Sequence, residues 1–167
     1  MLTSTGHQIS PFNIDGLQLF NNFKISKKVL MIEDNQDIIN VVRTVLLKKF
    51  NCKVDIAVDS FEAMNLISEK FYDLIILDWQ LPGLNGKETL LQAEEGLRLE
   101  PYLPFQWDRE KIPVVIFSAS PKEECSFRRT EHFDYVGFVS KSLPLTKMIE
   151  ELGEYIENSQ GYKYHIA

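Results

Sequence analysis

Five polar side chains with complementary chemistry each follow a short apolar run, in the order Glu33, Asp34, Asp78, Ser118 and Lys141. Glu33, Asp34 and Asp78 would bring up to three negative charges together, an arrangement that protonation or a cation must relieve. Two carboxylates with carbonyls and waters suit Mg²⁺ better than a transition metal, because no His or Cys is close in sequence. Lys141 adds a fixed positive charge and Ser118 a hydroxyl donor. Together they could complement a phosphoryl group carried by Asp78 acting as a nucleophile.

Short apolar runs alternate with segments of helical periodicity between Lys28 and Lys141. The runs are Val29 to Ile32, Val54 to Val58, Leu74 to Leu77, Val114 to Phe117 and Tyr135 to Val139. This alternation is typical of βαβ units, which build a parallel sheet. Because the carboxyl ends of parallel strands share one edge, we expect the five polar side chains to converge there.

The pattern within each segment predicts its surroundings. Four runs are apolar at consecutive positions, which predicts strands covered on both faces, whereas the run from Val54 to Val58 alternates and is expected nearer a sheet edge. The capping box Asp59-Ser60-Phe61-Glu62 opens a helix. The clearest amphipathic helix follows Pro144, and about five helices are expected in all.

Each polar side chain also has a structural explanation when it is taken alone. Glu33 or Asp34 could cap the first helix, and Ser118 could cap the fourth. Lys141 could be a solvated strand end. The four sites together favour function, because independently placed polar groups converge only if the strands are parallel.

Composition narrows the class of protein. The 167 residues suffice for one domain with a core. Lys and Arg total 18 against 24 Asp and Glu, for a net charge of −6, so the charge pattern of a nucleic-acid-binding protein is missing and partners are expected to be proteins or small molecules. Cys52, Cys125 and three scattered histidines predict neither a disulfide framework nor a zinc cluster. With no apolar run near the ~20 residues of a membrane span, we expect a cytoplasmic protein without membrane contact.

Segments outside the alternating pattern divide the chain. We expect an N-terminal extension at residues 1–27, a main domain at 28–158 and a C-terminal tail at 159–167. Folding of the extension back onto the core is favoured over a partner-binding arm. Residues 96–112 form a long connection with two prolines and three aromatics, for which packing on the domain's own surface and a docking role are both open.

Several motifs in their order resemble the receiver domain of two-component response regulators. The motifs are Glu33-Asp34, Leu77-Asp78 with Pro82-Gly83 and Gly86, Ser118-Ala119 and Lys141, and the resemblance covers about residues 27 to 158. It implies an α/β, flavodoxin-like (βα)5 three-layer sandwich with a five-stranded parallel sheet. It also implies that Asp78 accepts a phosphoryl group from a sensor histidine kinase or a His-containing phosphotransfer protein.

The resemblance further implies how the site is built and read. Asp34, Asp78 and the backbone carbonyl of Gln80 would bind Mg²⁺, with Glu33 acting on the metal through water. Ser118 and Phe138 match the hydroxyl and aromatic switch positions, although Phe138 could simply be a core aromatic. The switch would bias a surface of the fourth helix, fifth strand and fifth helix that binds a downstream protein target. Formation of a homodimer is left open.

The sequence departs from the family pattern at several positions. Ser142 follows Lys141 where proline is usual, which puts a cis peptide in doubt. Asn85 stands where aspartate is common and is expected in a turn. The connection at 96–112 is longer than usual. Gln80 and Ser120 occupy the positions that tune dephosphorylation in the family.

The expected function is therefore a phosphorylation-controlled interaction module or a carrier in a phosphorelay. Little more than the last helix follows Lys141, so we expect a stand-alone receiver whose only activity is self-catalysed phosphorylation and dephosphorylation. One alternative is a pseudo-receiver scaffold that acts without phosphorylation. A haloacid-dehalogenase-like phosphatase would need a second acid where Gln80 stands. In a flavodoxin-like flavin binder, the acidic residues 33–37 would repel a cofactor phosphate.

Overall fold

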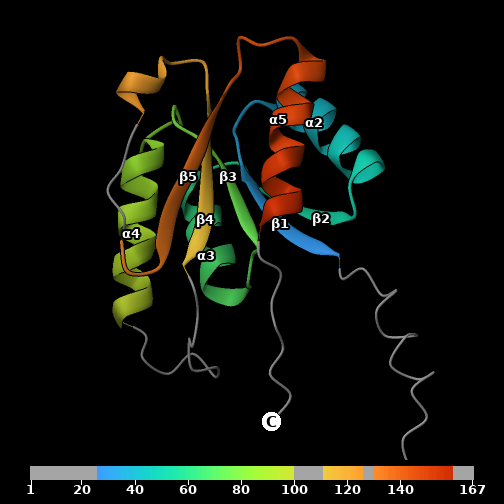
Figure 1. Ribbon diagram of the computed structural model, residues 1–167. Coiled ribbons are helices and arrows are strands. Elements are labelled where there is room, and N and C mark those ends of the chain that lie inside the picture. The colour runs from blue at the N-terminus through green and yellow to red at the C-terminus, as the bar shows by residue number, and fades with distance from the viewer. Residues whose placement is uncertain (1–25, 100–110, 126–129, 160–167) are drawn as a thin grey trace, which may run out of the picture.

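The computed structural model describes residues 26–99, 111–125 and 130–159, which form a three-layer α/β sandwich (Figure 1). The expectations for the N-terminal extension, the tail and most of the connection at 96–112 fall outside these ranges. Within the described ranges, none of the helices has both the length and the apolar character to span a membrane.

Five parallel strands form one sheet in the order β2-β1-β3-β4-β5. They are β1 (Lys27–Ile32), β2 (Cys52–Ala57), β3 (Leu74–Asp78), β4 (Ile112–Ser118) and β5 (Phe133–Ser140). This is the flavodoxin-like, doubly wound strand order, so the predicted fold class is confirmed. The direction of winding reverses between β1 and β3, which opens a crevice at the carboxyl ends of these two strands.

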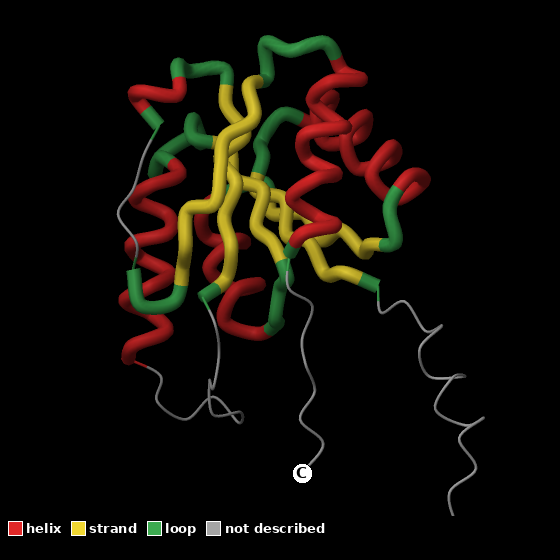
Figure 2. Tube along the Cα trace, viewed as in Figure 1, coloured by secondary structure: helices red, strands yellow, loops and turns green. Residues whose placement is uncertain are grey.

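Four α-helices cover the two faces of the sheet in the described residues (Figure 2). They are α2 (Gln36–Lys49), α3 (Ser60–Glu69), α4 (Gly86–Leu99) and α5 (Leu145–Asn158). Residues of α3 and α4 pack in one core cluster, and residues of α2 and α5 pack in the other. Along β1, Leu30 and Ile32 face the first cluster while Val29 and Met31 face the second. This two-sided burial explains the run of consecutive apolar residues.

The two edge strands give different outcomes for the burial predictions. β2 lies at one edge, as its sequence predicts, but its burial alternates only from Cys52 to Asp55: Ile56 is half-buried and Ala57 is buried. β5 was expected to be covered on both faces, and that prediction is wrong. β5 is the other edge strand, and its Val136 is 42% exposed at a bulge opposite Val114 and Val115.

Side-chain caps begin α2 and α3. Asn35 caps α2 by accepting bonds from the N–H groups of Asp37 and Ile38, so neither Glu33 nor Asp34 is its cap. Asp59 caps α3 through the N–H of Glu62 at 2.8 Å, which confirms the predicted helix start. Caps of this kind satisfy N–H groups that lack a partner in the first turn.

The connection between β4 and β5 departs from the expectation of five helices. Its described residues contain only the 3-10 helix η1 (Lys122–Glu124), and residues 126–129 are not described. The N-cap of η1 is Pro121, so Ser118 does not cap it. The segment begins with a proline and a charged Lys-Glu-Glu run, which provides no apolar stripe to hold an α-helix against the sheet.

Candidate functional site

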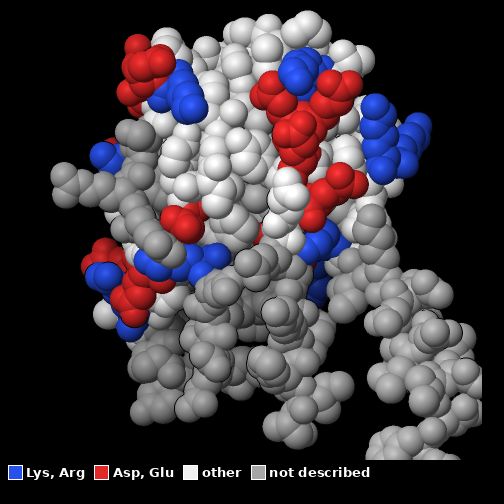
Figure 3. All heavy atoms as spheres, in the orientation of Figure 1, with Lys and Arg blue, Asp and Glu red and all other residues white. Residues whose placement is uncertain are grey.

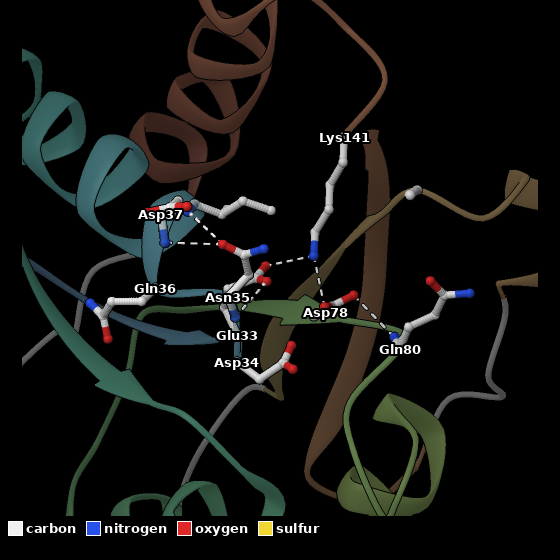
Figure 4. Close-up of a pocket in the computed structure, with 10 residues that line it drawn as sticks. Glu33, Asp34, Asn35, Gln36, Asp37, Asp78, Gln80 and Lys141 are labelled. Carbon is white, nitrogen blue, oxygen red and sulfur yellow. Dashed lines mark hydrogen bonds and ion pairs between the residues drawn. The ribbon is translucent and has the colours of Figure 1, made fainter.

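Four of the polar side chains that follow the strands, those of Glu33, Asp34, Asp78 and Lys141, converge at the carboxyl edge of the sheet (Figure 4). Glu33 and Asp34 follow β1, and Asp78 is the last residue of β3. Ser118 ends β4, and Lys141 follows β5. Glu33, Asp34, Asp78 and Lys141 border an open cleft of about 560 Å³. Its lining also includes Asn35, Gln36, Asp37, Ile38, Gln80 and Ala119.

Lys141 joins two of the carboxylates. Its Nζ lies 2.7 Å from Glu33 Oε2 and 2.7 Å from Asp78 Oδ2. All three side chains are largely buried, with 12% of Lys141, 1% of Glu33 and 5% of Asp78 exposed. Nζ also lies 5.3 Å from the centroid of the Phe117 ring, which adds a favourable cation–π contact. These contacts fix the lysine ammonium between two strand ends.

Negative charge at the site exceeds the positive charge of Lys141. Glu33, Asp34 and Asp78 can each offer one carboxylate oxygen, and these oxygens lie within 4.8 Å of one another. Burial raises the pKa of Glu33, and the nearby Asp78 charge adds to the rise against the opposing effect of Lys141. The carboxylate cluster therefore suits a small, hard cation with oxygen ligands, and no thiol or imidazole belongs to it.

The Asp78 carboxylate is held in one orientation. Its Oδ1 accepts a hydrogen bond from the N–H of Gln80 at 3.0 Å, while Oδ2 faces Lys141. The first oxygen is thus tied to the loop that follows β3, and the second to the end of β5. The structure places the backbone of Gln80 beside Asp78, and metal binding by its carbonyl stays a prediction.

Two glycines shape the loop that follows Asp78. Gly83 has a φ of +85°, a conformation that side-chain-bearing residues rarely adopt. A Cβ on Gly86 would lie 2.6 Å from the Asp78 carbonyl oxygen, so only glycine lets α4 start this close to β3. Asn85 caps α4, because its Oδ1 accepts the Glu88 N–H at 3.0 Å. Backbone conformation thus explains the glycine at position 83 of the sequence motif, and close packing explains the glycine at position 86.

The two predicted switch residues lie on neighbouring strands. Ser118 is fully buried, and its Oγ accepts the N–H of Ser120 at 3.0 Å. Its carbonyl accepts the Lys141 N–H at 2.8 Å. Phe138 pairs with Ile116 in the β4–β5 ladder and is half-buried, which leaves both the switch and the core interpretation open. The described residues contain no cis peptide, so the bond between Lys141 and Ser142 is trans.

Sequence reasoning missed a second polar cluster, which lies between α4 and the start of β5. Buried Glu94 of α4 accepts backbone N–H groups from Glu131 at 3.0 Å and His132 at 3.1 Å. Its Oε1 also lies 3.0 Å from His132 Nδ1 and 3.6 Å from Arg98 Nε. The hydrogen bonds of this carboxylate hold α4 against the start of β5. No local sequence signal could have revealed the contacts with Glu131 and His132, because these residues are 37 and 38 positions away.

Hydrogen bonds lower the pKa of Glu94. Burial alone would raise the pKa of this carboxyl, but hydrogen bonds from Thr130 and His132 hold it below the ordinary value. Glu94, Glu131 and His132 also have the spacing of a metal-ligating group. Because donors already surround the Glu94 oxygens, we interpret this cluster as structural.

Comparison with known families and proteins gives one consistent match. The family model of the response regulator receiver domain matches residues 29–153. Regulatory protein VanRB of Enterococcus faecalis is 31% identical over 130 residues, which cover 77% of this chain and 53% of that protein. Autoinducer 2 sensor kinase/phosphatase LuxQ of Vibrio harveyi is 43% identical over 77 residues, or 46% of this chain and 9% of that protein. The chain thus spans between a tenth and about half the length of these relatives.

Solved structures agree on the fold. The receiver domain of the Francisella response regulator 1452 superposes with a TM-score of 0.55 at 23% identity, over 81% of this chain and 100% of that chain. The receiver domain of sensor histidine kinase PA1611 from Pseudomonas aeruginosa superposes with a TM-score of 0.56 at 19% identity, over 80% of this chain and 99% of that chain. At these identities the likeness shows the fold alone.

Proposed function

The chain belongs to the response regulator receiver domain family of two-component signalling, and on that premise we propose that Asp78 accepts a phosphoryl group from a phosphohistidine. The observation that carries the proposal is the geometry around Asp78. Its carboxylate is buried at the mouth of the crevice, with one oxygen on the Gln80 N–H and the other 2.7 Å from Lys141 Nζ. A sensor histidine kinase or a His-containing phosphotransfer protein would be the donor.

The proposed transfer exchanges one bond to phosphorus for another. A carboxylate oxygen of Asp78 attacks the phosphorus atom, and the bond between phosphorus and the donor's imidazole nitrogen breaks. The electron pair of that bond leaves with the imidazole, which takes up a proton from water. The product is an aspartyl phosphate. Because the nucleophile is a carboxylate, it needs no general base on this chain.

Lys141 would stabilise the charge of the transferred group. Its ammonium already touches Asp78 Oδ2, so a phosphoryl group on Asp78 would lie within reach of the same donor. The second ion pair, to Glu33, keeps the ammonium at the site during transfer. The chain's own catalytic contribution is therefore positioning and charge neutralisation, and its activity would be limited to its own phosphorylation and dephosphorylation.

The carboxylate cluster fits Mg²⁺. Asp34, Asp78 and the backbone carbonyl of Gln80 would hold the ion, with Glu33 acting through water. When bound, the ion would neutralise charge on the phosphoryl oxygens. The surplus of carboxylates over Lys141 supports this assignment. The structure of the PA1611 receiver domain, which has a magnesium ion coordinated in its active site cleft, supports it by analogy.

The signal would pass to a protein that binds the face made by β5, α5 and η1, the 3-10 helix that stands where the fourth helix was expected. Ser118 and Phe138 would link Asp78 to this face. Figure 3 shows a mostly uncharged band over β5 and acidic side chains gathered over α5. The exposed glutamates of α5 are Glu150, Glu154 and Glu157. A downstream partner, or the next carrier in a phosphorelay, would therefore present apolar and basic side chains, and a second copy of the chain is the other candidate.

Incubation with acetyl phosphate and Mg²⁺, followed by intact mass measurement, tests the proposal. We expect one labile phosphoryl group on the wild type and none on Asp78→Asn, which keeps the side-chain shape but loses the nucleophilic oxygen. No adduct at saturating donor, together with unchanged amide chemical shifts on addition of beryllofluoride, would favour the scaffold alternative. An adduct that persists in Asp78→Asn would place the acceptor elsewhere.

A further inference from the structure

A buried aromatic ring lies against the ammonium of Lys141. Lys141 Nζ lies over the ring of Phe117, 5.3 Å from the centroid, which is within the ~6 Å reach of a cation–π contact. Phe117 is 1% exposed and the lysine side chain is 12% exposed, so solvent screens the attraction only weakly. None of the steps proposed for phosphoryl transfer involves this ring.

Strand pairing places the ring beside the phosphorylation site. Phe117 of β4 pairs with Asp78 of β3 on one side and with Val139 of β5 on the other. The side chains of Phe117 and Val139 pack in the core cluster that α2 and α5 cover, as does that of Ile76, two residues before Asp78. Alternate residues of a strand share a face, so Asp78 points to the same face as the ring. The ring therefore lies between the strand that ends in Asp78 and the strand that precedes Lys141.

The contacts of Lys141 differ in whether they persist through the transfer. The ion pair with Asp78 Oδ2 at 2.7 Å depends on the charge of that carboxylate. Once a carboxylate oxygen is bonded to phosphorus, the negative charge lies on the phosphoryl oxygens, and the ammonium must turn to them instead. The cation–π contact with Phe117 and the ion pair with Glu33 at 2.7 Å do not depend on the charge of Asp78. These two contacts can hold the ammonium while its third partner changes.

We propose that Phe117 is a positioning residue whose ring face holds the Lys141 ammonium at the site while negative charge moves from Asp78 to the phosphoryl group. This inference rests on the proposed function of Asp78. A lysine side chain has a long flexible stem, so an ammonium released by Asp78 loses its place unless other contacts restrict it. The ring raises the fraction of molecules in which the ammonium is ready to receive the phosphoryl oxygens.

Graded fluorination of the ring tests this inference. Phenylalanine analogues with one, two or three ring fluorines are incorporated at position 117, where each fluorine withdraws negative charge from the ring face and changes its volume little. The initial rate of phosphorylation by acetyl phosphate in saturating Mg²⁺ should fall stepwise, by about 2- to 10-fold in total. Phe133 is the matched control, because it is also fully buried but packs in the core cluster on the other face of the sheet. The same analogues at position 133 should leave the rate unchanged.

The NMR signal of the Lys141 ε-methylene protons provides a second readout, which a role confined to core packing would not produce. The face of an aromatic ring shifts nearby protons upfield, so these protons should resonate upfield of those of the exposed Lys53. Phe117→Leu keeps an apolar side chain but removes the ring. We expect this substitution to move the Lys141 signal downfield, toward that of Lys53.

The outcomes separate this inference from the proposed function. Equal rates for all analogues at position 117 would overturn the inference, as would an equal loss of rate at positions 117 and 133. A Lys141 signal that does not move in Phe117→Leu would also contradict it. In each of these cases, phosphorylation of the wild type leaves the proposed function intact. A wild type that takes no phosphoryl group from acetyl phosphate would overturn the proposed function, and the inference with it.

Discussion

Two buried glutamates, one at the carboxyl ends of the strands and one beside the start of β5, differ in how well the groups around them compensate their charge. Glu33, after β1, receives the Lys141 ammonium at 2.7 Å and one backbone N–H, from Asn35, at 3.3 Å. It shares these surroundings with two further carboxylates. Glu94, in α4, receives two backbone N–H groups, an imidazole nitrogen and a guanidinium. One site has too few donors for its charges, and the other has several donors for one charge.

The pKa shifts follow this difference. Burial raises the pKa of Glu33, because the donors around it do not compensate for lost hydration. Burial acts on Glu94 as well, but hydrogen bonds from Thr130 and His132 outweigh it and lower the pKa. A buried charge with matched donors stabilises a fold, whereas a buried charge without them is poised to bind something. We therefore assign Glu94 to structure and Glu33 to the proposed site.

Glu94→Ala should have the largest effect on stability. It leaves the N–H groups of Glu131 and His132 without their acceptor and separates α4 from the start of β5. We expect the free energy of unfolding to fall by about 3 kcal/mol, measured by urea denaturation at neutral pH. Glu95→Ala, at an exposed neighbouring position, is the control. If Glu94→Ala lowers the free energy of unfolding no more than Glu95→Ala does, Glu94 does not have the structural role assigned to it.

Glu33→Gln should act in the other direction. In metal-free buffer it removes one of three clustered charges and leaves Lys141 paired with Asp78, so we expect the free energy of unfolding to rise by about 1 kcal/mol. The same change should weaken Mg²⁺ binding, measured as the shift of Tm with Mg²⁺ concentration. Destabilisation without metal, or an unchanged Mg²⁺ response, would show that Glu33 is structural too.

The two glutamates should also differ in how they change the pH dependence of stability, an effect smaller than those of the two substitutions above. Glu94 has a lowered pKa in the folded state, so its contribution is present above the unfolded value near 4.5 and is lost as pH falls through the folded pKa. Glu33 has a raised pKa, so its charged form costs stability at neutral pH and protonation relieves that cost as pH falls through the folded value.

Urea denaturation of Glu33→Gln, Glu94→Gln and the wild type between pH 4 and 8 measures this difference. The advantage of Glu33→Gln should shrink as the pH falls from neutral toward 4.5, the ordinary pKa of a glutamate side chain. The deficit of Glu94→Gln should hold across that range and shrink only below it, each with a slope of at most about 1.4 kcal/mol per pH unit. Parallel curves for the two variants would contradict the assigned pKa directions.

The residues that sequence reasoning placed correctly lie in segments whose own pattern of apolar and polar residues predicts the structure. The consecutive apolar residues of β1 and β3 predict covered central strands, and parallel strands bring Asp78 toward Glu33 and Lys141. The edge position of β5 was missed, because the run from Tyr135 to Val139 is as apolar as a central strand. The hydrogen bonds between Glu94 and His132 depend on tertiary packing, and no pattern of neighbouring residues encodes them.

The most direct test of the central claim is to locate the phosphoryl group itself. After incubation with acetyl phosphate and Mg²⁺, borohydride reduces an aspartyl phosphate to homoserine, which peptide mass spectrometry assigns to one position. We expect homoserine at position 78, and we expect it to disappear when Mg²⁺ is removed by a chelator. Phosphorylated protein that yields homoserine at another aspartate, with Asp78 intact, would contradict it.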